Sequence, residues 1–253
     1  ARTRASTGVR VLPARGAFGW STWKDACAVA LLVACMLASA ACSDSSGPSA
    51  ATLLAQAQTA FSQLTSFHFT LAAQHLGGND PLPITQATGD VRRPDQLSVT
   101  ASVVSALGPV QVKLIILGSQ EWITDPLTGA FQPTTNYAGF LANFDAQQGV
   151  GATLTQLRNA STPQSSSAAA GACWKISGTL PASAVAGVVN GAAGSNASVP
   201  TSICIGKSDS ELYSISLAGA VSQSDPAQTS RTFALTRFNQ PVTITAPVPT
   251  PTT

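Results

Sequence analysis

The residues that most often carry chemistry are few in this sequence. It has two histidines, His68 and His75, and neither has a cysteine pair or a carboxylate cluster at metal-ligand spacing. It contains no Gly-x-Ser-x-Gly motif, no phosphate-binding loop and no Cys-x-x-Cys motif. Aspartates such as Asp95 and Asp125 lie in or beside turn-like segments, where local hydrogen bonding favours Asp. The sequence therefore predicts that the protein is not an enzyme and binds no metal ion or cofactor.

Cys42 has the most specific sequence context of any residue. A positively charged stretch precedes the uncharged segment 26–41, which ends in Leu-Ala-Ser-Ala-Ala just before Cys42. This order is typical of a secretory signal. Its end resembles the lipobox of bacterial lipoproteins, in which the cysteine thiol is diacylated and the chain is cut just before it. We therefore expect residues 1–41 to be a signal peptide. Cys42 would then carry a diacylglycerol anchor that holds the protein on the extracytoplasmic face of the cell membrane.

Two alternatives to Cys42 remain open at this point. Ser39 stands where lipoboxes usually have Leu, and Leu32-Val33-Ala34-Cys35 fits the local pattern better, so Cys35 is a competing site of acylation. We favour Cys42 because a polar segment follows it at once, and residues 42–50 can serve as a flexible tether. An uncleaved membrane helix is the third interpretation, but the apolar run is shorter than the roughly 20 residues that span a bilayer.

The charge of the mature chain excludes one class of partner. Five of the 13 Lys and Arg, and one of the 11 Asp and Glu, precede residue 43, which leaves 8 positive against 10 negative side chains. Nucleic-acid binding needs clustered cations that neutralise phosphates, and the only adjacent pair in the mature chain is Arg92 and Arg93. We therefore expect no nucleic-acid partner.

The rest of the chain predicts an α+β fold with one domain, residues 51–248, followed by a disordered tail at 249–253. Apolar residues at three- and four-residue spacing predict a helix over 51–64, and helical segments are also expected near 146–157 and 181–189. Alternating patterns separated by short turns predict an antiparallel sheet. The expected strands begin at Ser66 and then cover 84–91, 97–107, 110–117, 121–124, 173–178, 202–206, 212–217, 232–238 and 242–246. A sheet of this size is expected to be strongly curved or partly closed.

Cys173 and Cys204 are predicted to form a disulfide. Each lies near the start of an expected strand, and both belong to the part of the chain expected outside the cytoplasm, where disulfides persist. Two buried free thiols are the alternative.

The strand at 110–117 is apolar on both faces, which means that both sides of the sheet are covered there. Helices would cover one side. The sequence alone leaves open whether a packed element or a ligand cavity accounts for the other.

Several segments together resemble the mycobacterial-type lipoprotein family of LppX, LprA, LprF and LprG. They are the Cys42 anchor, 64–69 (Leu-Thr-Ser-Phe-His-Phe), 121–123 (Glu-Trp-Ile), 137–144 (Tyr-Ala-Gly-Phe-Leu-Ala-Asn-Phe), 175–178 (Lys-Ile-Ser-Gly) and 181–185 (Pro-Ala-Ser-Ala-Val). The resemblance implies a half-barrel, that is, a strongly curved antiparallel sheet with helices on its concave face. It also implies an apolar cavity for the acyl chains of a lipid or glycolipid, which the protein binds and carries.

If the resemblance holds, the protein is a monomer whose ligand is an acylated lipid or glycolipid, held by burial of hydrocarbon without any reactive side chain. A structural or interaction lipoprotein of the cell envelope with no ligand cavity is the alternative. The residues expected to line the cavity are Phe67, Phe69, Leu71, Val99, Val103, Val112, Leu114, Ile116, Trp122, Phe140, Leu141 and Phe144.

Overall fold

The computed structural model describes residues 47–77, 83–105, 108–145, 149–186, 198–221 and 224–248. The expected signal peptide, Cys35, Cys42 and the predicted tail at 249–253 lie outside these residues. The part of the chain from Gly47 onward forms a compact unit of its own. Among the described residues, no helix has both the length and the apolar character needed to cross a bilayer.

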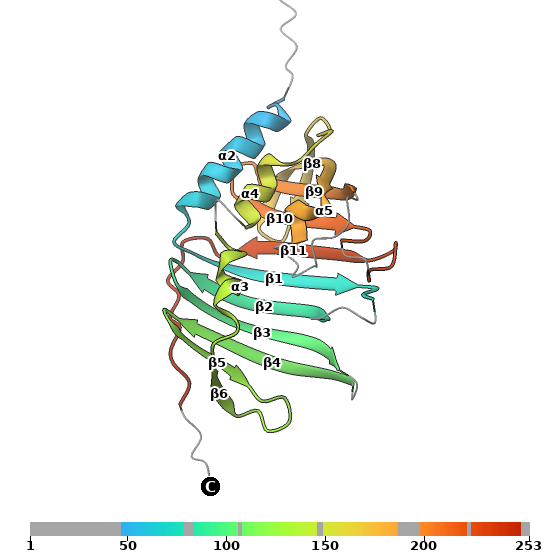
Figure 1. Ribbon diagram of the computed structural model, residues 1–253. Helices are drawn as coiled ribbons and strands as arrows, with labels where there is room; N and C mark the ends of the chain where they lie inside the picture. Colours follow the sequence, from blue (N-terminus) through green and yellow to red (C-terminus); the bar gives the residue numbers. More distant parts are fainter. Residues whose placement is uncertain are drawn as a thin grey trace, which may run out of the picture. The chain divides into compact units, whose positions relative to one another are not determined.

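The described part of the chain contains one large sheet and four short helices (Figure 1). The helices are α2 (Ala50–Gln63), α3 (Ala138–Ala142), α4 (Val150–Thr155) and α5 (Ala182–Ala186). The strands are β1 (Ser66–Gln74), β2 (Ile84–Arg92), β3 (Gln96–Ser105), β4 (Gly108–Leu117), β5 (Gln120–Thr124), β6 (Phe131–Thr134), β7 (Gln164–Ala168), β8 (Gly171–Pro181), β9 (Ser198–Gly206), β10 (Leu212–Ala218) and β11 (Ser230–Thr236).

The sheet has 11 strands in the order β6-β5-β4-β3-β2-β1-β11-β10-β9-β8-β7, and every neighbouring pair is antiparallel. Strands β1 to β6 and strands β7 to β11 each form a meander, and β11 returns to pair with β1 at the centre. The large antiparallel sheet predicted from the sequence is therefore confirmed. The sheet is not strongly curled, so the structure does not establish the half-barrel.

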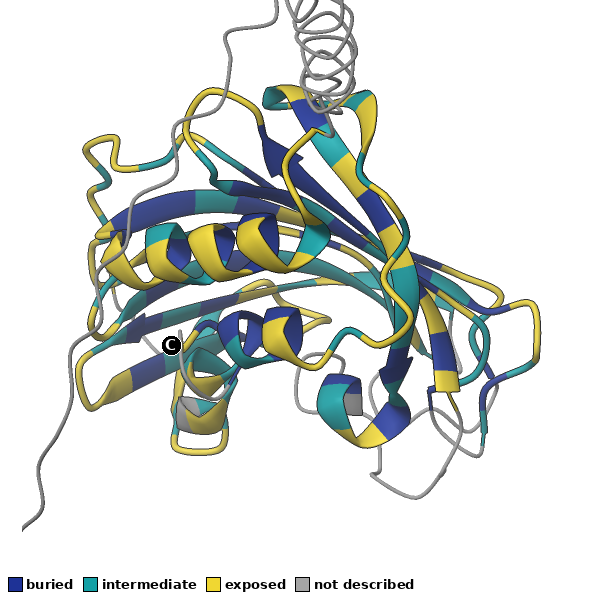
Figure 2. Ribbon diagram, turned by 90° about the horizontal axis from the view of Figure 1, so that it is seen from above, coloured by how far each residue is buried: buried dark blue, intermediate teal, exposed yellow. Residues whose placement is uncertain are grey.

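Helix α2 forms where the sequence predicts a helix. Ser49 is its N-cap, and its hydroxyl oxygen accepts a hydrogen bond from the backbone N–H of Thr52 at 3.1 Å. Leu53, Leu54, Ala57 and Phe61 are buried along one face, as their three- and four-residue spacing requires. Figure 2 shows this helix lying over the sheet with its exposed residues turned outward.

Two strands were missed in the sequence and one was wrongly predicted. Strands β6 and β7 were not predicted, because their residues, such as Gln132 and Ser165, show no alternation of apolar and polar side chains. The segment 242–246 alternates in this way but is not a strand in the structure. It follows Pro241 and precedes Pro247, and proline cannot donate a ladder hydrogen bond.

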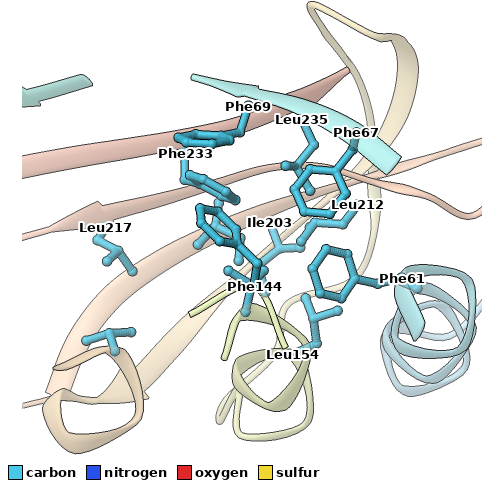
Figure 3. Close-up of a cluster of buried hydrophobic side chains, with 14 of the residues drawn as sticks. Phe61, Phe67, Phe69, Phe144, Leu154, Ile203, Leu212, Leu217, Phe233 and Leu235 are labelled. Carbon is cyan, nitrogen blue, oxygen red and sulfur yellow. The ribbon is translucent and has the colours of Figure 1, made fainter. Parts of the chain in front are cut away.

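An aromatic cluster joins the helical layer to the sheet. Phe144, which follows α3, packs on Phe69 of β1 with 4.8 Å between ring centroids, on Phe67 at 5.9 Å and on Phe233 of β11 at 6.0 Å. Phe61 of α2 packs on Phe67 at 5.7 Å. Figure 3 shows these rings converging from α2, the segment after α3, and the sheet. The centre of the sheet is therefore closed by rings and not hollow.

A smaller apolar cluster lies on the opposite face of the sheet, around a disulfide. Cys173 of β8 and Cys204 of β9 are bonded, with their Cα atoms 5.6 Å apart, which confirms the predicted pair. Tyr213 packs against this cluster and stacks on Phe238 at a centroid distance of 5.8 Å. The bond therefore fixes β8 to β9 near the edge of the sheet.

We expect loss of this disulfide to lower stability. The bond closes a separation of 31 residues, for which the chain-entropy estimate is about 3 to 4 kcal/mol in the free energy of unfolding. The double variant Cys173→Ser/Cys204→Ser should unfold at correspondingly lower urea concentration. Urea unfolding of the wild type with and without a reductant is the control, and a variant as stable as the oxidised wild type would contradict the expectation.

Candidate functional site

An apolar cavity of about 150 Å³ lies on the helix-facing side of strands β2 to β5. The strand register brings its walls together, because Ala101 pairs with Ala87 on one side and with Val112 on the other, and Leu114 pairs with Ile123. The lining residues are Ile84, Ala87, Val99, Ala101, Val103, Val112, Leu114, Ile123, Tyr137 and Phe140. None of them carries a charge, and all except Tyr137 are wholly apolar, so the cavity would hold a ligand mainly by apolar contact.

Small residues on the inner face leave this space open. Ala87 and Ala101 face each other across β2 and β3, where larger side chains would fill the cavity. Beside them, a Cβ atom placed on Gly89 would lie 2.9 Å from the Phe69 ring, so glycine allows that ring to lie against the sheet. The cavity therefore begins where the aromatic cluster ends.

Helix α3 covers the cavity and is fixed by Glu121. The Glu121 side chain points to the inner face of β5 and is buried, and its Oε2 accepts a hydrogen bond from the Tyr137 backbone N–H at 2.8 Å. Tyr137 is the N-cap of α3 and makes no side-chain cap of its own. The carboxylate thus takes the place of a capping side chain and holds α3, with Phe140, over the cavity.

Arg93 connects three segments around the aromatic cluster. Its Nη1 donates hydrogen bonds to the carbonyl oxygens of Phe61 at 2.6 Å and Leu64 at 3.1 Å, and its Nη2 donates to the Phe144 carbonyl at 2.9 Å. The guanidinium also lies 4.6 Å from the Phe61 ring centroid. Burial lowers the pKa of Arg93 below its ordinary value, although the Asp145 and Glu211 carboxylates oppose this. The cation therefore donates to two carbonyls at the end of α2, of which the Phe61 carbonyl also accepts the Leu64 N–H at 3.4 Å.

A second space, which we call the Arg93 groove, has a volume of about 420 Å³ and is open to the surface. Its lining residues are Ser62, Val91, Arg93, Pro94, Leu141, Ala142, Phe144 and Asp145. Phe140 lines the apolar cavity, whereas Leu141 lines the groove. Helix α3 therefore lies between the two spaces.

The residues predicted to line a cavity divide into several groups. Val99, Val103, Val112, Leu114 and Phe140 line the apolar cavity. Phe67, Phe69 and Ile116 are closed core, Leu71 borders a void of only about 20 Å³, and Leu141 and Phe144 line the Arg93 groove. That any of them contacts a lipid stays a prediction.

The structure places Trp122 outside the apolar cavity. Strand β5 pairs Trp122 with Ile115, on the face away from the helices, while Glu121 and Ile123 point inward. Successive side chains of a strand point to opposite faces, so an error of one residue in phase reverses the assignment.

Ile84, Ala87, Ala101, Ile123 and Tyr137 were missed in the sequence. Ala101 and Ile123 could have been found from the phase of their strands, since Val99 and Leu114 are their same-face neighbours. Nothing local points to Tyr137, because it reaches the cavity only through the position of α3.

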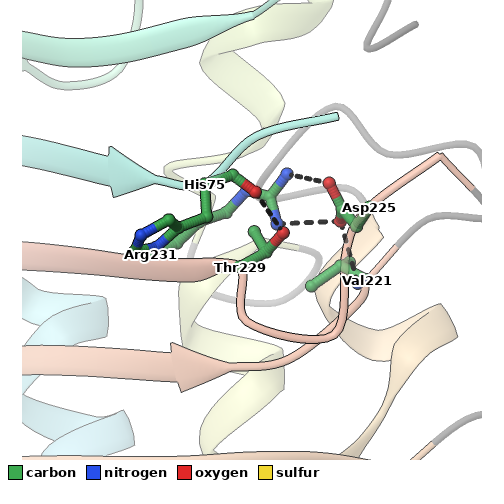
Figure 4. A network of polar contacts seen from close by, with 5 residues as sticks. All are labelled: His75, Val221, Asp225, Thr229 and Arg231. Atoms are coloured by element: carbon green, nitrogen blue, oxygen red, sulfur yellow. Dashed lines mark hydrogen bonds and ion pairs between the residues drawn. The ribbon is translucent and has the colours of Figure 1, made fainter. Parts of the chain in front are cut away.

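The charged residues of the core serve packing. Arg231 of β11 and Asp225 form a buried ion pair with two contacts, 2.9 and 2.8 Å, and Asp225 also accepts from the Val221 N–H at 2.9 Å (Figure 4). The Thr229 hydroxyl donates to the His75 carbonyl at 2.7 Å, which attaches this loop to the end of β1. In the ranges that the structure describes, no three His, Cys, Asp or Glu side chains come close enough to share a metal ion.

Glu211 precedes β10 and is the carboxylate most affected by its surroundings. Burial, together with the neighbouring Asp209, raises the pKa of Glu211 to about 7, while Arg93 partly offsets the shift. Its Oε2 is buried without a hydrogen-bond partner in the described part of the chain.

The comparison with protein families fits this architecture. A family model described as LppX_LprAFG lipoprotein matches residues 49–244. The chain belongs to this family. No curated protein sequence matches it significantly.

Two solved structures of this lipoprotein family show the same fold. LprF from Mycobacterium bovis is similar with a TM-score of 0.63 and 17% identity, over 78% of this chain and 96% of LprF. LppX from Mycobacterium tuberculosis is similar with a TM-score of 0.55 and 22% identity, over 77% of this chain and 98% of LppX. At these identities the similarity concerns the fold alone.

Arg93 offers a sharp test of how the helical layer is held. We expect Arg93→Met to lower the free energy of unfolding by about 3 kcal/mol, because three carbonyl oxygens lose a charged donor. Arg92→Met is the matched control, since Arg92 is exposed and adjacent, and should change stability by less than about 0.5 kcal/mol. Equal effects in urea unfolding would show that Arg93 does not hold these segments.

Glu211 predicts how stability depends on pH. Its pKa is about 7 in the folded protein against an ordinary value of 4.5, so between these values the folded protein keeps a proton that the unfolded chain has lost. The free energy of unfolding should therefore fall as the pH rises from 4.5 to 7. Glu211→Gln cannot titrate and should flatten this profile in urea unfolding measured across the range. An unchanged slope in the variant would assign the dependence to another group.

Proposed function

We propose that this protein is a lipid-anchored, extracytoplasmic lipoprotein that binds and carries an acylated lipid or glycolipid, without enzymatic activity. The observation that carries the proposal is the uncharged cavity beneath α3, in a chain of the LppX_LprAFG lipoprotein family. Burial of hydrocarbon contributes about 0.8 kcal/mol per CH₂, so such a wall can bind an acyl chain without any reactive side chain. The anchor is Cys42, which precedes the body by a short polar tether.

The size of the cavity limits how a lipid can bind. Its volume of about 150 Å³ lies below the roughly 300–1,000 Å³ of most ligand pockets, so only part of an acyl chain fits. Helix α3 has five residues and separates this cavity from the Arg93 groove. We infer that a bound lipid displaces α3 and joins the two spaces. Stronger bending of the sheet, as in the half-barrel that the family resemblance implies, would widen the same region.

A second candidate function is supported by the aromatic cluster. Phe61 and Phe67 are fully buried and Phe144 is 5% exposed, so the middle of the helix-facing side is packed shut. A structural or interaction lipoprotein of the envelope needs only such a closed core.

Ligand detection combined with one pair of variants tests these candidates. We expect the chain starting at residue 43, expressed in a bacterial host, to retain host lipid in native mass spectrometry. Ala101→Phe should lose that lipid, because the ring would fill the cavity. Ser102→Phe is the control, since Ser102 follows in the same strand and points to the opposite face. Absence of lipid from the wild type, or equal retention in both folded variants, would favour the structural lipoprotein.

A further inference from the structure

The face of the sheet that points away from the helices carries an open groove of about 330 Å³, which we call the polar groove. It is lined by Thr70, Leu71, Ala72, Gln86, Ala87, Thr88, Thr100, Ser102 and Gln111, all from strands β1 to β4. Leu71 and Ala87 direct their side chains to the inner face, so hydroxyl and amide groups make up most of the lining.

The strand register arranges these groups in two parallel rows. Thr70, Thr88 and Thr100 are partners across β1, β2 and β3. In the next row Gln86, Ser102 and Gln111 are partners across β2, β3 and β4. Neighbouring strands lie about 4.8 Å apart, so each row repeats a hydrogen-bonding group at a regular interval across the strands. Ala72 is the register partner of Gln86 in β1 and adds no hydrogen-bonding side chain to this row.

Most of these side chains have hydrogen-bonding capacity that the protein does not use. The Thr88 hydroxyl is 3.1 Å from His68 Nε2. Among the residues that the structure describes, the side chains of Thr70, Gln86, Thr100, Ser102 and Gln111 make no hydrogen bond within the protein. They are therefore available to a ligand, and each can both donate and accept.

The chemistry of the groove selects among ligand classes. None of its lining residues is charged. Among nearby charged side chains, Asp90 lies 2.8 Å from His68 Nδ1, and Lys113, the register partner of Thr100, forms no ion pair with any residue that the structure describes. A phosphate-rich or acidic ligand requires clustered cations, which are missing here. A peptide adding a strand needs an unpaired edge, whereas β1 to β4 are paired on both sides. A sugar chain presents rows of hydroxyls that donate and accept, as these side chains do.

We propose that the polar groove binds a neutral polysaccharide along the rows of Thr, Ser and Gln side chains on β1 to β4. Each hydrogen bond to a sugar hydroxyl is weak, and binding depends on several strands contributing at once. The groove lies on the opposite face of the sheet from the apolar cavity, so this binding does not depend on the proposed lipid site. If the protein is anchored at a membrane as proposed, binding at this groove would attach the outer face of its sheet to a neutral polysaccharide of the cell envelope.

Retention on polysaccharide beads tests the proposal with the full-length protein in mild detergent. We expect retention on beads carrying mannan or arabinogalactan, released by the same soluble polysaccharide, and no retention on beads carrying the acidic polysaccharide alginate. The variant Thr70→Val/Thr100→Val/Ser102→Ala removes three hydroxyls and should weaken retention about tenfold or more. A second variant, Gln86→Ala/Gln111→Ala, should weaken it similarly and serves if the first does not fold.

The matched control is Ser202→Ala/Ser214→Ala, which removes two hydroxyls from β9 and β10 outside the groove and should change retention less than twofold. Thermal unfolding confirms that each variant is folded. Lipid content should be equal in all of them, which separates this proposal from the lipid site. Retention on neither neutral polysaccharide, retention on alginate beads only, or an equal loss in the groove and control variants would overturn it.

Discussion

The contact between the Phe144 ring and the sheet is the interaction on which the rest of the structure depends. Phe144 lies between α3 and α4 and packs on rings from β1 and β11, the two strands at which the N-terminal and C-terminal meanders meet. Arg93 strengthens the same contact because it donates a hydrogen bond to the Phe144 carbonyl while holding the end of α2. Both helices before and after Phe144 are only five or six residues long, too short to be stable alone, so their positions follow from this contact.

The same contact sets where an apolar ligand could bind. Rings fill the space over β1 and β11, and the cavity remains only beside them, over β2 to β5, where Ala87 and Ala101 are small. Glu121 holds the cover of that cavity through one hydrogen bond to Tyr137. The cover has only five residues and is held by this hydrogen bond and by packing of Tyr137, Phe140 and Leu141 on the core, so it can move at lower cost than the closed centre.

A single layer of strands separates two surfaces of opposite character. Over most of β1 to β4, alternation places Val, Leu, Phe and Ala toward the helices and Thr, Ser and Gln toward the other face. The C-terminal end of β4 is apolar on both faces, because Ile115 and Leu117 point away from the helices. Ala87 of β2 lines both the polar groove and the apolar cavity, because only one layer of strands separates the two spaces. A shift of one residue in register would exchange the two surfaces, so the paired strands specify both candidate binding sites at once.

Much of this architecture was determined by the sequence itself. The apolar spacing in α2 predicts the helix, and the alternation in most strands predicts the antiparallel sheet, because both patterns are local. The disulfide was predicted because Cys173 and Cys204 each lie near a strand start in a part of the chain expected outside the cytoplasm. Other features were decided only by the tertiary structure. The pairing of β1 with β11, the hydrogen bond from the Tyr137 N–H to Glu121, and the hydrogen bonds from Arg93 to three carbonyls join residues far apart in the chain. No local pattern encodes such contacts, because they arise only when the two meanders and the short helices pack together.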